Sequence, residues 1–90
     1  MIIDYPLEEE VITSPDYTFR FCAPDDTSAV EVSIDGSPWR ECRRAHGYFW
    51  FDWSHYGRGE HTLAARRRCA GGTLWDGGVR HLRVDGDEHA

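Results

Sequence analysis

The stretch that decides the fold is residues 30–53, VEVSIDGSPWRECRRAHGYFWFDW. Across 30–35, β-branched residues alternate with polar ones, so one side of an extended chain is apolar, as in a half-buried strand. Asp35 and Gly36 follow, and glycine can take the positive φ that a tight turn requires. The run at 47–53 is almost entirely aromatic, and the whole stretch holds six of the chain's twelve aromatic residues. The pattern predicts two strands, with a turn after the first.

The same alternation recurs in the rest of the chain. At 17–22, the aromatic residues Tyr17, Phe19 and Phe21 fall on one side and Thr, Arg and Cys on the other. Further strands are expected at 11–13, 39–44, 48–53, 60–69 and 79–84, with turns or loops at 14–16, 23–28, 45–47, 54–59 and 70–78. Short, regularly spaced strands without helical periodicity predict an all-β fold, a seven-stranded immunoglobulin-like β-sandwich.

The length of 90 residues suits one domain with a single modest core. We expect the sandwich domain to span 11–85. Residues 1–10 form an N-terminal lead-in that docks through isoleucine or tyrosine side chains. The polar residues 86–90 form a flexible tail.

The charge and hydropathy of the chain exclude several classes of partner. A formal net charge of −6 argues against nucleic acid, which attracts cationic surfaces. No stretch approaches the ~18 apolar residues of a membrane helix. The segment MIIDYPLEEE has neither a basic region nor a long apolar run, so we expect a cytoplasmic protein without a membrane partner.

Three segments, in this order and spacing, support a comparison with a known family: VEVSIDGSPW at 30–39, WFDW at 50–53 and GEHTLAARRR at 59–68. They resemble an immunoglobulin-like domain of the early-set (E-set) type, and more narrowly the dimerisation domain of sulfite-oxidase-family molybdenum enzymes. TFRFCAP at 18–24 and GYFW at 47–50 resemble, more loosely, the glycogen- and starch-binding modules of amylase-family enzymes. The first resemblance implies assembly with a partner or a second copy, and the second implies carbohydrate binding.

Large aromatic side chains are the candidate binding residues. Assigning Phe49, Phe51 and Trp53 to the core leaves the alternate residues of the same strand on its other face. The full candidate set is Trp39, Tyr48, Trp50, Tyr56 and Trp75. Three interpretations stay open for these rings: cover for the core or a sheet edge, a protein interface, or a platform on which sugar rings stack.

Arginines gather in two runs, Arg43 with Arg44 and a second run at 66–68. On adjacent strands they would form a cationic stripe suited to phosphate or acidic groups. The simpler interpretation is charge that keeps an edge strand soluble, since sixteen acidic residues are available to pair with ten arginines.

The cysteines also have two interpretations, a disulfide in the core or reduced thiols. The order Cys22, Trp39, Cys69 is similar to the disulfide and tryptophan in the core of antibody domains. However, Cys22 falls on the face opposite Phe19 and Phe21, so reduced, partly buried thiols are favoured. Three cysteines also suit a reducing compartment better than a disulfide framework.

The histidines and acidic residues indicate no catalytic or metal site. None of the histidines has the spacing of a metal-ligand motif, although two of them, His61 and His81, are candidates for neighbours across strands. No nucleophile elbow or phosphate-binding loop is present. The sequence therefore predicts a non-enzymatic protein without a cofactor: an interaction or assembly module that binds a protein partner or itself. The alternative is a carbohydrate-binding module that uses exposed aromatic residues to hold a polysaccharide.

Overall fold

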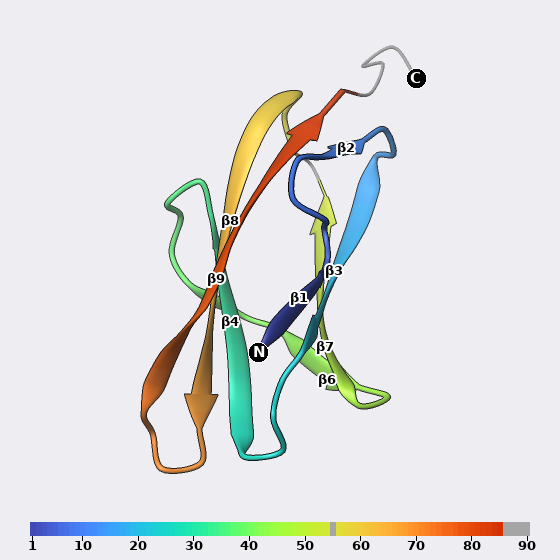
Figure 1. Cartoon of the computed structure of the whole chain (residues 1–90). Coiled ribbons are helices and arrows are strands. Elements are labelled where there is room, and N and C mark those ends of the chain that lie inside the picture. Colours follow the sequence, from blue (N-terminus) through green and yellow to red (C-terminus); the bar gives the residue numbers. More distant parts are fainter. Residues whose placement is uncertain (55, 86–90) are drawn as a thin grey trace.

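The computed structural model describes residues 1–54 and 56–85. Within this part of the chain, nine strands form two sheets, so the β-sandwich is confirmed with two more strands than expected. Sheet A has the strand order β1-β3-β7-β6, and sheet B has the order β2-β9-β8-β4-β5 (Figure 1). The strands are β1 (Ile2–Tyr5), β2 (Glu10–Ile12), β3 (Asp16–Cys22), β4 (Thr27–Ile34), β5 (Arg40–Glu41), β6 (Arg43–Ala45), β7 (Tyr48–Ser54), β8 (Gly59–Cys69) and β9 (Leu74–Val84). A membrane-spanning helix is not found among these residues.

Sheet A contributes aromatic side chains to the core. β3 and β7 are antiparallel, and their register places Phe19 opposite Phe51 and Phe21 opposite Phe49. All four rings are buried, and Trp53 is half-buried at the same face. The predicted inward faces of both strands are therefore confirmed.

Sheet B contributes mainly aliphatic side chains. β4 pairs with β8, and Val30, Val32 and Leu63 are buried against the rings of sheet A. β9 adds Leu82 and Val84, as its alternation predicts. The core therefore lies between one aromatic and one aliphatic layer, which matches the packing expected of two sheets that each bury one face.

The segment 39–44 was expected to form one strand, and this expectation is wrong. It contains β5 in sheet B and β6 in sheet A, and the chain crosses from one sheet to the other at Cys42. The side chain of Cys42 is buried, and its backbone N–H donates to the Val30 carbonyl at 2.8 Å. Because of this crossing, Arg43 and Arg44 are not beside the arginines of β8, so no stripe joins the two runs.

Two further segments differ from the sequence interpretation. Residues 1–10 contain β1, an edge strand that pairs with β3 and buries Ile3. The expected loop at 70–78 ends early because β9 already begins at Leu74, with a register shift where Asp76 and Gly78 pair with β8. Such a bulge lets a strand continue through glycines that resemble a loop in the sequence. The predicted tail, 86–90, lies outside the described residues.

Both turns expected from the sequence, at Asp35 with Gly36 and at 45–47, are present, but only the second is a two-residue loop between adjacent paired strands. His46 and Gly47 have φ values of 53° and 80° and join β6 directly to β7, with Ala45 opposite Tyr48. Asp35 and Gly36 also have positive φ, but a longer connection follows them before β5 begins. Both pairs are compatible with the left-handed turn conformations that two-residue hairpin loops use.

Candidate interaction surface

A row of five side chains crosses the outer face of sheet A, and we call it the arginine–aromatic band. In order it contains Tyr5, Arg20, Tyr48, Trp50 and Arg43. The guanidinium carbon of Arg20 lies 4.9 Å from the ring centre of Tyr5 and 4.6 Å from that of Tyr48. Tyr48 and Trp50 meet edge to face, with ring centres 5.8 Å apart, and Arg43 lies 5.8 Å from the Trp50 ring centre. Rings and guanidinium groups at such distances attract one another.

Strand register explains why these residues meet. Tyr5 of β1 is the partner of Arg20 in β3, and Arg20 is the partner of Trp50 in β7. Trp50 is in turn the partner of Arg43 in β6. Cross-strand partners on one face lie close enough for their side chains to interact, so the band follows from pairing among all four strands of sheet A.

Carboxylates hold both arginines of the band. The Nε of Arg20 donates to Asp4 at 3.2 Å, and Arg43 donates to Asp52 through two nitrogens at 3.0 and 3.2 Å. The hydrogen bonds from Arg43 lower the pKa of Asp52, which also accepts a bond from the Thr18 hydroxyl. Each arginine of the band is therefore paired with a carboxylate, although the whole chain has a net charge of −6.

The rings of the band are only partly accessible. Tyr5 is 43% exposed, whereas Tyr48 and Trp50 are half-buried because arginine side chains lie over them. The indole N–H of Trp50 donates to the Ala45 carbonyl at 2.9 Å, which fixes the ring against the β6–β7 hairpin. The band is thus an ordered surface of rings and guanidinium groups.

The other predicted binding residues lie elsewhere. Trp39 immediately precedes β5 and is 40% exposed, with the guanidinium of Arg66 4.1 Å from its ring centre. Trp75 is in β9 and is 53% exposed, beside Arg67. β8 and β4 separate these two strands, so the two tryptophans do not lie on adjacent strands of sheet B.

Tyr56 belongs to the end of the core. Its ring stacks on Trp53 at 4.0 Å between ring centres, and its hydroxyl donates to the Ser14 carbonyl. Trp53 also contacts the His61 ring edge to face at 5.1 Å. Of the five predicted binding residues, the structure therefore brings together only Tyr48 and Trp50.

Three residues of the band, Tyr5, Arg20 and Arg43, were not among the predicted binding residues, although Arg43 was named in the candidate arginine stripe. The alternation at 17–22 does place Arg20 on the outward side of its strand. That signal identifies an exposed arginine but not the rings beside it, because strand pairing is not visible in local alternation.

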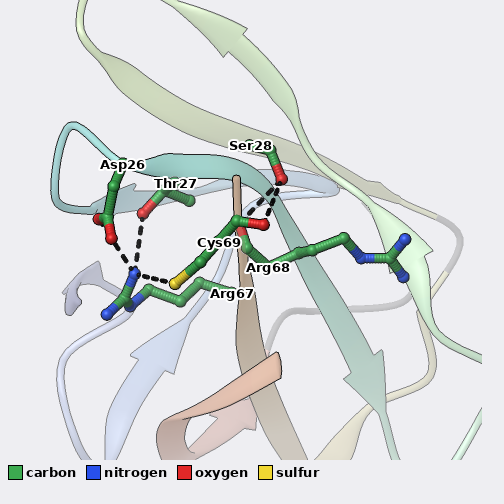
Figure 2. A network of polar contacts seen from close by, with 6 residues as sticks. All are labelled: Asp26, Thr27, Ser28, Arg67, Arg68 and Cys69. Atoms are coloured by element: carbon green, nitrogen blue, oxygen red, sulfur yellow. Dashed lines mark hydrogen bonds and ion pairs between the residues drawn. The ribbon is translucent and has the colours of Figure 1, made fainter. Parts of the chain in front are cut away.

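The arginine run of β8 is paired with acidic and polar groups. Arg66 and Arg68 both reach Glu31, with nitrogen–oxygen distances of 2.8 and 3.8 Å. Arg67 points to the other side of β8, as Figure 2 shows. Its partners there are the carboxylate of Asp26, the hydroxyl of Thr27 and the sulfur of Cys69. These contacts favour a structural role for the run.

Metal-ligand groups meet at one place among residues 1–54 and 56–85. The ligand atoms of Glu8, Glu9 and His81 lie within 4.8 Å of one another, and all three residues are exposed. Glu8 already accepts bonds from the backbone N–H of His81, at 2.6 Å, and from its ring. His61 is not part of this group, because the partner of His81 across the strands is Thr62 and the two histidines point to opposite faces. His55 and His89 lie outside the described residues.

All three cysteines are free thiols. Burial raises the pKa of Cys42 to about 12, so this thiol stays protonated at neutral pH. Cys22 and Cys69 are half-buried.

The architecture is similar to that of several solved protein structures. The chain superposes on the fibronectin(III)-like modules of Clostridium thermocellum CbhA with a TM-score of 0.74 and 17% identity, covering 92% of both chains. The fold is a fibronectin(III)-like sandwich. No protein-family model matches the sequence, and no curated protein matches it significantly.

Two longer chains contain a similar sandwich. One is the endo-beta-1,4-mannanase from Thermotoga petrophila, with a TM-score of 0.74 and 15% identity over 96% of this chain. The other is an engineered protein, with a TM-score of 0.73 and 19% identity over 92% of this chain. In each case the match covers 19% of the longer chain, and at these identities the likeness shows the fold alone.

Proposed function

We propose that this chain is a non-catalytic interaction module that binds protein, a second copy of itself included, through the arginine–aromatic band. The observation that carries the proposal is the ordered row of tyrosine, tryptophan and arginine across one sheet face. These three residue types are enriched at the energetically dominant positions of protein interfaces.

Preorganisation supports the same function. Arg20 and Arg43 are held by carboxylates and by the rings beneath them, so a partner would not have to order them on binding. Avoiding that cost in side-chain entropy is one of the main ways in which an interface gains affinity.

Charge balance makes a second copy a suitable partner. Two chains of net charge −6 repel one another on average. The face around the band carries Asp4 and Asp52 as well as its two arginines, so opposite charges can face each other when two such surfaces meet. The resemblance to dimerisation domains supports the same choice.

The test is sedimentation equilibrium of the native chain over micromolar concentrations, with Trp50→Ala and Trp75→Ala as a matched pair. We expect reversible dimers, and Trp50→Ala should weaken association about 30-fold, the ratio for a hot-spot loss of about 2 kcal/mol. Trp75→Ala, which removes a more exposed ring from the other sheet, should leave association unchanged. A strict monomer would contradict self-association, and equal losses in both variants would contradict the assignment to the band.

Carbohydrate binding is the second candidate, favoured by the likeness to a segment of a mannanase chain and by the exposed Trp39 and Trp75. Its difficulty is geometric, because the Tyr48 and Trp50 planes meet at 70° and form no flat platform for a sugar ring. Retention of the native chain on insoluble mannan or starch, lost in Trp39→Ala or Trp75→Ala, would favour this candidate over the first.

A further inference from the structure

The imidazole of His61 lies between two hydrogen-bond acceptors. Its Nδ1 is 2.6 Å from a carboxylate oxygen of Asp35, and its Nε2 is 2.6 Å from the carbonyl oxygen of Gly57. The His61 side chain is only 13% exposed. A neutral imidazole donates through one nitrogen and accepts through the other, whereas a carboxylate and a carbonyl only accept. Both contacts are hydrogen bonds only when both nitrogens carry protons, so this geometry selects the imidazolium ion.

Asp35 is a fixed acceptor. Its second carboxylate oxygen accepts the backbone N–H of Thr62 at 2.8 Å, and its own N–H donates to the Thr62 carbonyl at 2.9 Å. The turn that begins at Asp35 is therefore bound to β8 independently of His61. Through its imidazole, His61 then connects this turn to Gly57, which lies between β7 and β8.

The residues that His61 ties down close one end of the core. Tyr56, next to Gly57, stacks on Trp53 and donates to the Ser14 carbonyl. Trp53 also contacts the His61 ring. A change at His61 thus reaches a segment that covers the aromatic end of the sandwich.

We propose that His61 is a pH-sensitive latch, which as an imidazolium ties residues 56–58 to the turn at Asp35 and as a neutral ring releases the Gly57 carbonyl. The remaining proton stays between Nδ1 and the carboxylate, because a hydrogen bond to a charged acceptor is stronger than one to a carbonyl. The bare Nε2 lone pair then faces the Gly57 oxygen, and the two repel. The latch does not involve the arginine–aromatic band, so failure of either proposal leaves the other standing.

Asp35 is a charged group in direct contact with the imidazole. Tyr56 lies on the loop side of the imidazole. Glu60, His81 and Arg83 alternate with His61 and Leu82 along β8 and β9, so their side chains lie on the opposite face of sheet B from the imidazole.

The pKa directions agree with this geometry. Burial lowers the pKa of His61, but the hydrogen bonds to Asp35 and Gly57 outweigh burial and raise it above 6.5. Burial raises the pKa of Asp35, but its bonds from His61 and Thr62 lower it below 3.8. The stabilisation from His61 is therefore complete below pH 6.5 and lost as the pH rises through its folded pKa, whereas that from Asp35 is lost as the pH falls through its own lowered pKa. The latch is closed between these two titrations.

The experiment combines long-range proton–nitrogen NMR of the histidine rings with hydrogen exchange of the native chain over a pH series. At about pH 6, near the ordinary histidine pKa, both ring nitrogens of His61 should be protonated, and the ring should titrate above 6.5. Once corrected for intrinsic exchange rates, the amides of 56–58 should exchange at least several-fold faster after His61 is neutral.

Two variants and one control complete the test. Asp35→Asn should lower the His61 titration midpoint, and His61→Gln should make the corrected exchange of 56–58 independent of pH. His46→Asn, at an exposed turn with φ 53°, should leave both readouts unchanged. A neutral His61 tautomer at about pH 6, or the same pH dependence in His61→Gln as in the native chain, would overturn the latch.

Discussion

Phe19→Ala should lower the free energy of unfolding by about 3–5 kcal/mol, the usual cost of removing a buried phenylalanine ring. Phe19 is fully buried, and its ring contacts those of Tyr17, Phe51 and Trp53 with centres 5.3 to 6.1 Å apart. Trp53 also contacts three rings, but it is only half-buried, whereas Phe19 is fully buried. Small domains are stable by only about 5–15 kcal/mol, so the variant should be largely unfolded in mild urea.

The measurement is urea unfolding followed by circular dichroism, with Phe19→Leu as the matched control. Leucine keeps most of the apolar volume, so we expect a cost below about 1.5 kcal/mol. If Phe19→Ala cost no more than Phe19→Leu, the site would not be the centre of the core that the packing indicates.

The core was predictable because alternation is a local signal. At 17–22 the aromatic residues recur every second position, and a strand places such residues on one face whatever strand pairs with it. The burial of Phe19 and Phe21 follows from that rule alone. At 48–53 both faces carry aromatic residues, so the rule only separates Phe49 and Phe51 from Tyr48 and Trp50, and the assignment of the phenylalanines to the core was a choice that the structure confirms. The sandwich then follows because two half-apolar sheets must cover one another.

The crossing at Cys42 was not predictable for the opposite reason. The segment around it contains no glycine or proline that would mark a break between β5 and β6. Its place is set by a non-local contact, the hydrogen bond to Val30, and by burial of the thiol. The glycines at 77 and 78 had the opposite effect, because they predicted a loop where β9 in fact continues with a bulge.

The arginine–aromatic band could be predicted only in part. Tyr48 and Trp50 can be identified as outward-facing residues of their strand, because they alternate with buried phenylalanines. Tyr5 and Arg43 join them through the β1–β3 and β6–β7 pairings, and the sequence interpretation contained neither β1 nor a separate β6. The contacts of His61 could not be predicted from the sequence either, since its partner Asp35 is 26 residues away along the chain.

Adjacent residues of β7 should respond in opposite ways to the same substitution. Phe49→Ala removes a buried ring from the core and should cost about 3–5 kcal/mol of unfolding free energy. Tyr48→Ala removes a half-buried ring from the outer face, where the main loss is the contact with Arg20, worth about 0.5–1 kcal/mol at partly exposed sites. Self-association should show the reverse order, because Tyr48 belongs to the band and Phe49 does not.

Urea unfolding and sedimentation equilibrium of both variants measure the two effects separately, at a temperature where Phe49→Ala is still folded. Phe49→Leu gives a folded reference on the inner face if the alanine variant unfolds. A large stability loss in Tyr48→Ala with little loss in Phe49→Ala would show that the inner and outer faces of β7 are assigned the wrong way round. The same result would also contradict the arginine–aromatic band, because the two-residue period of a strand places Trp50 on the same side as Tyr48.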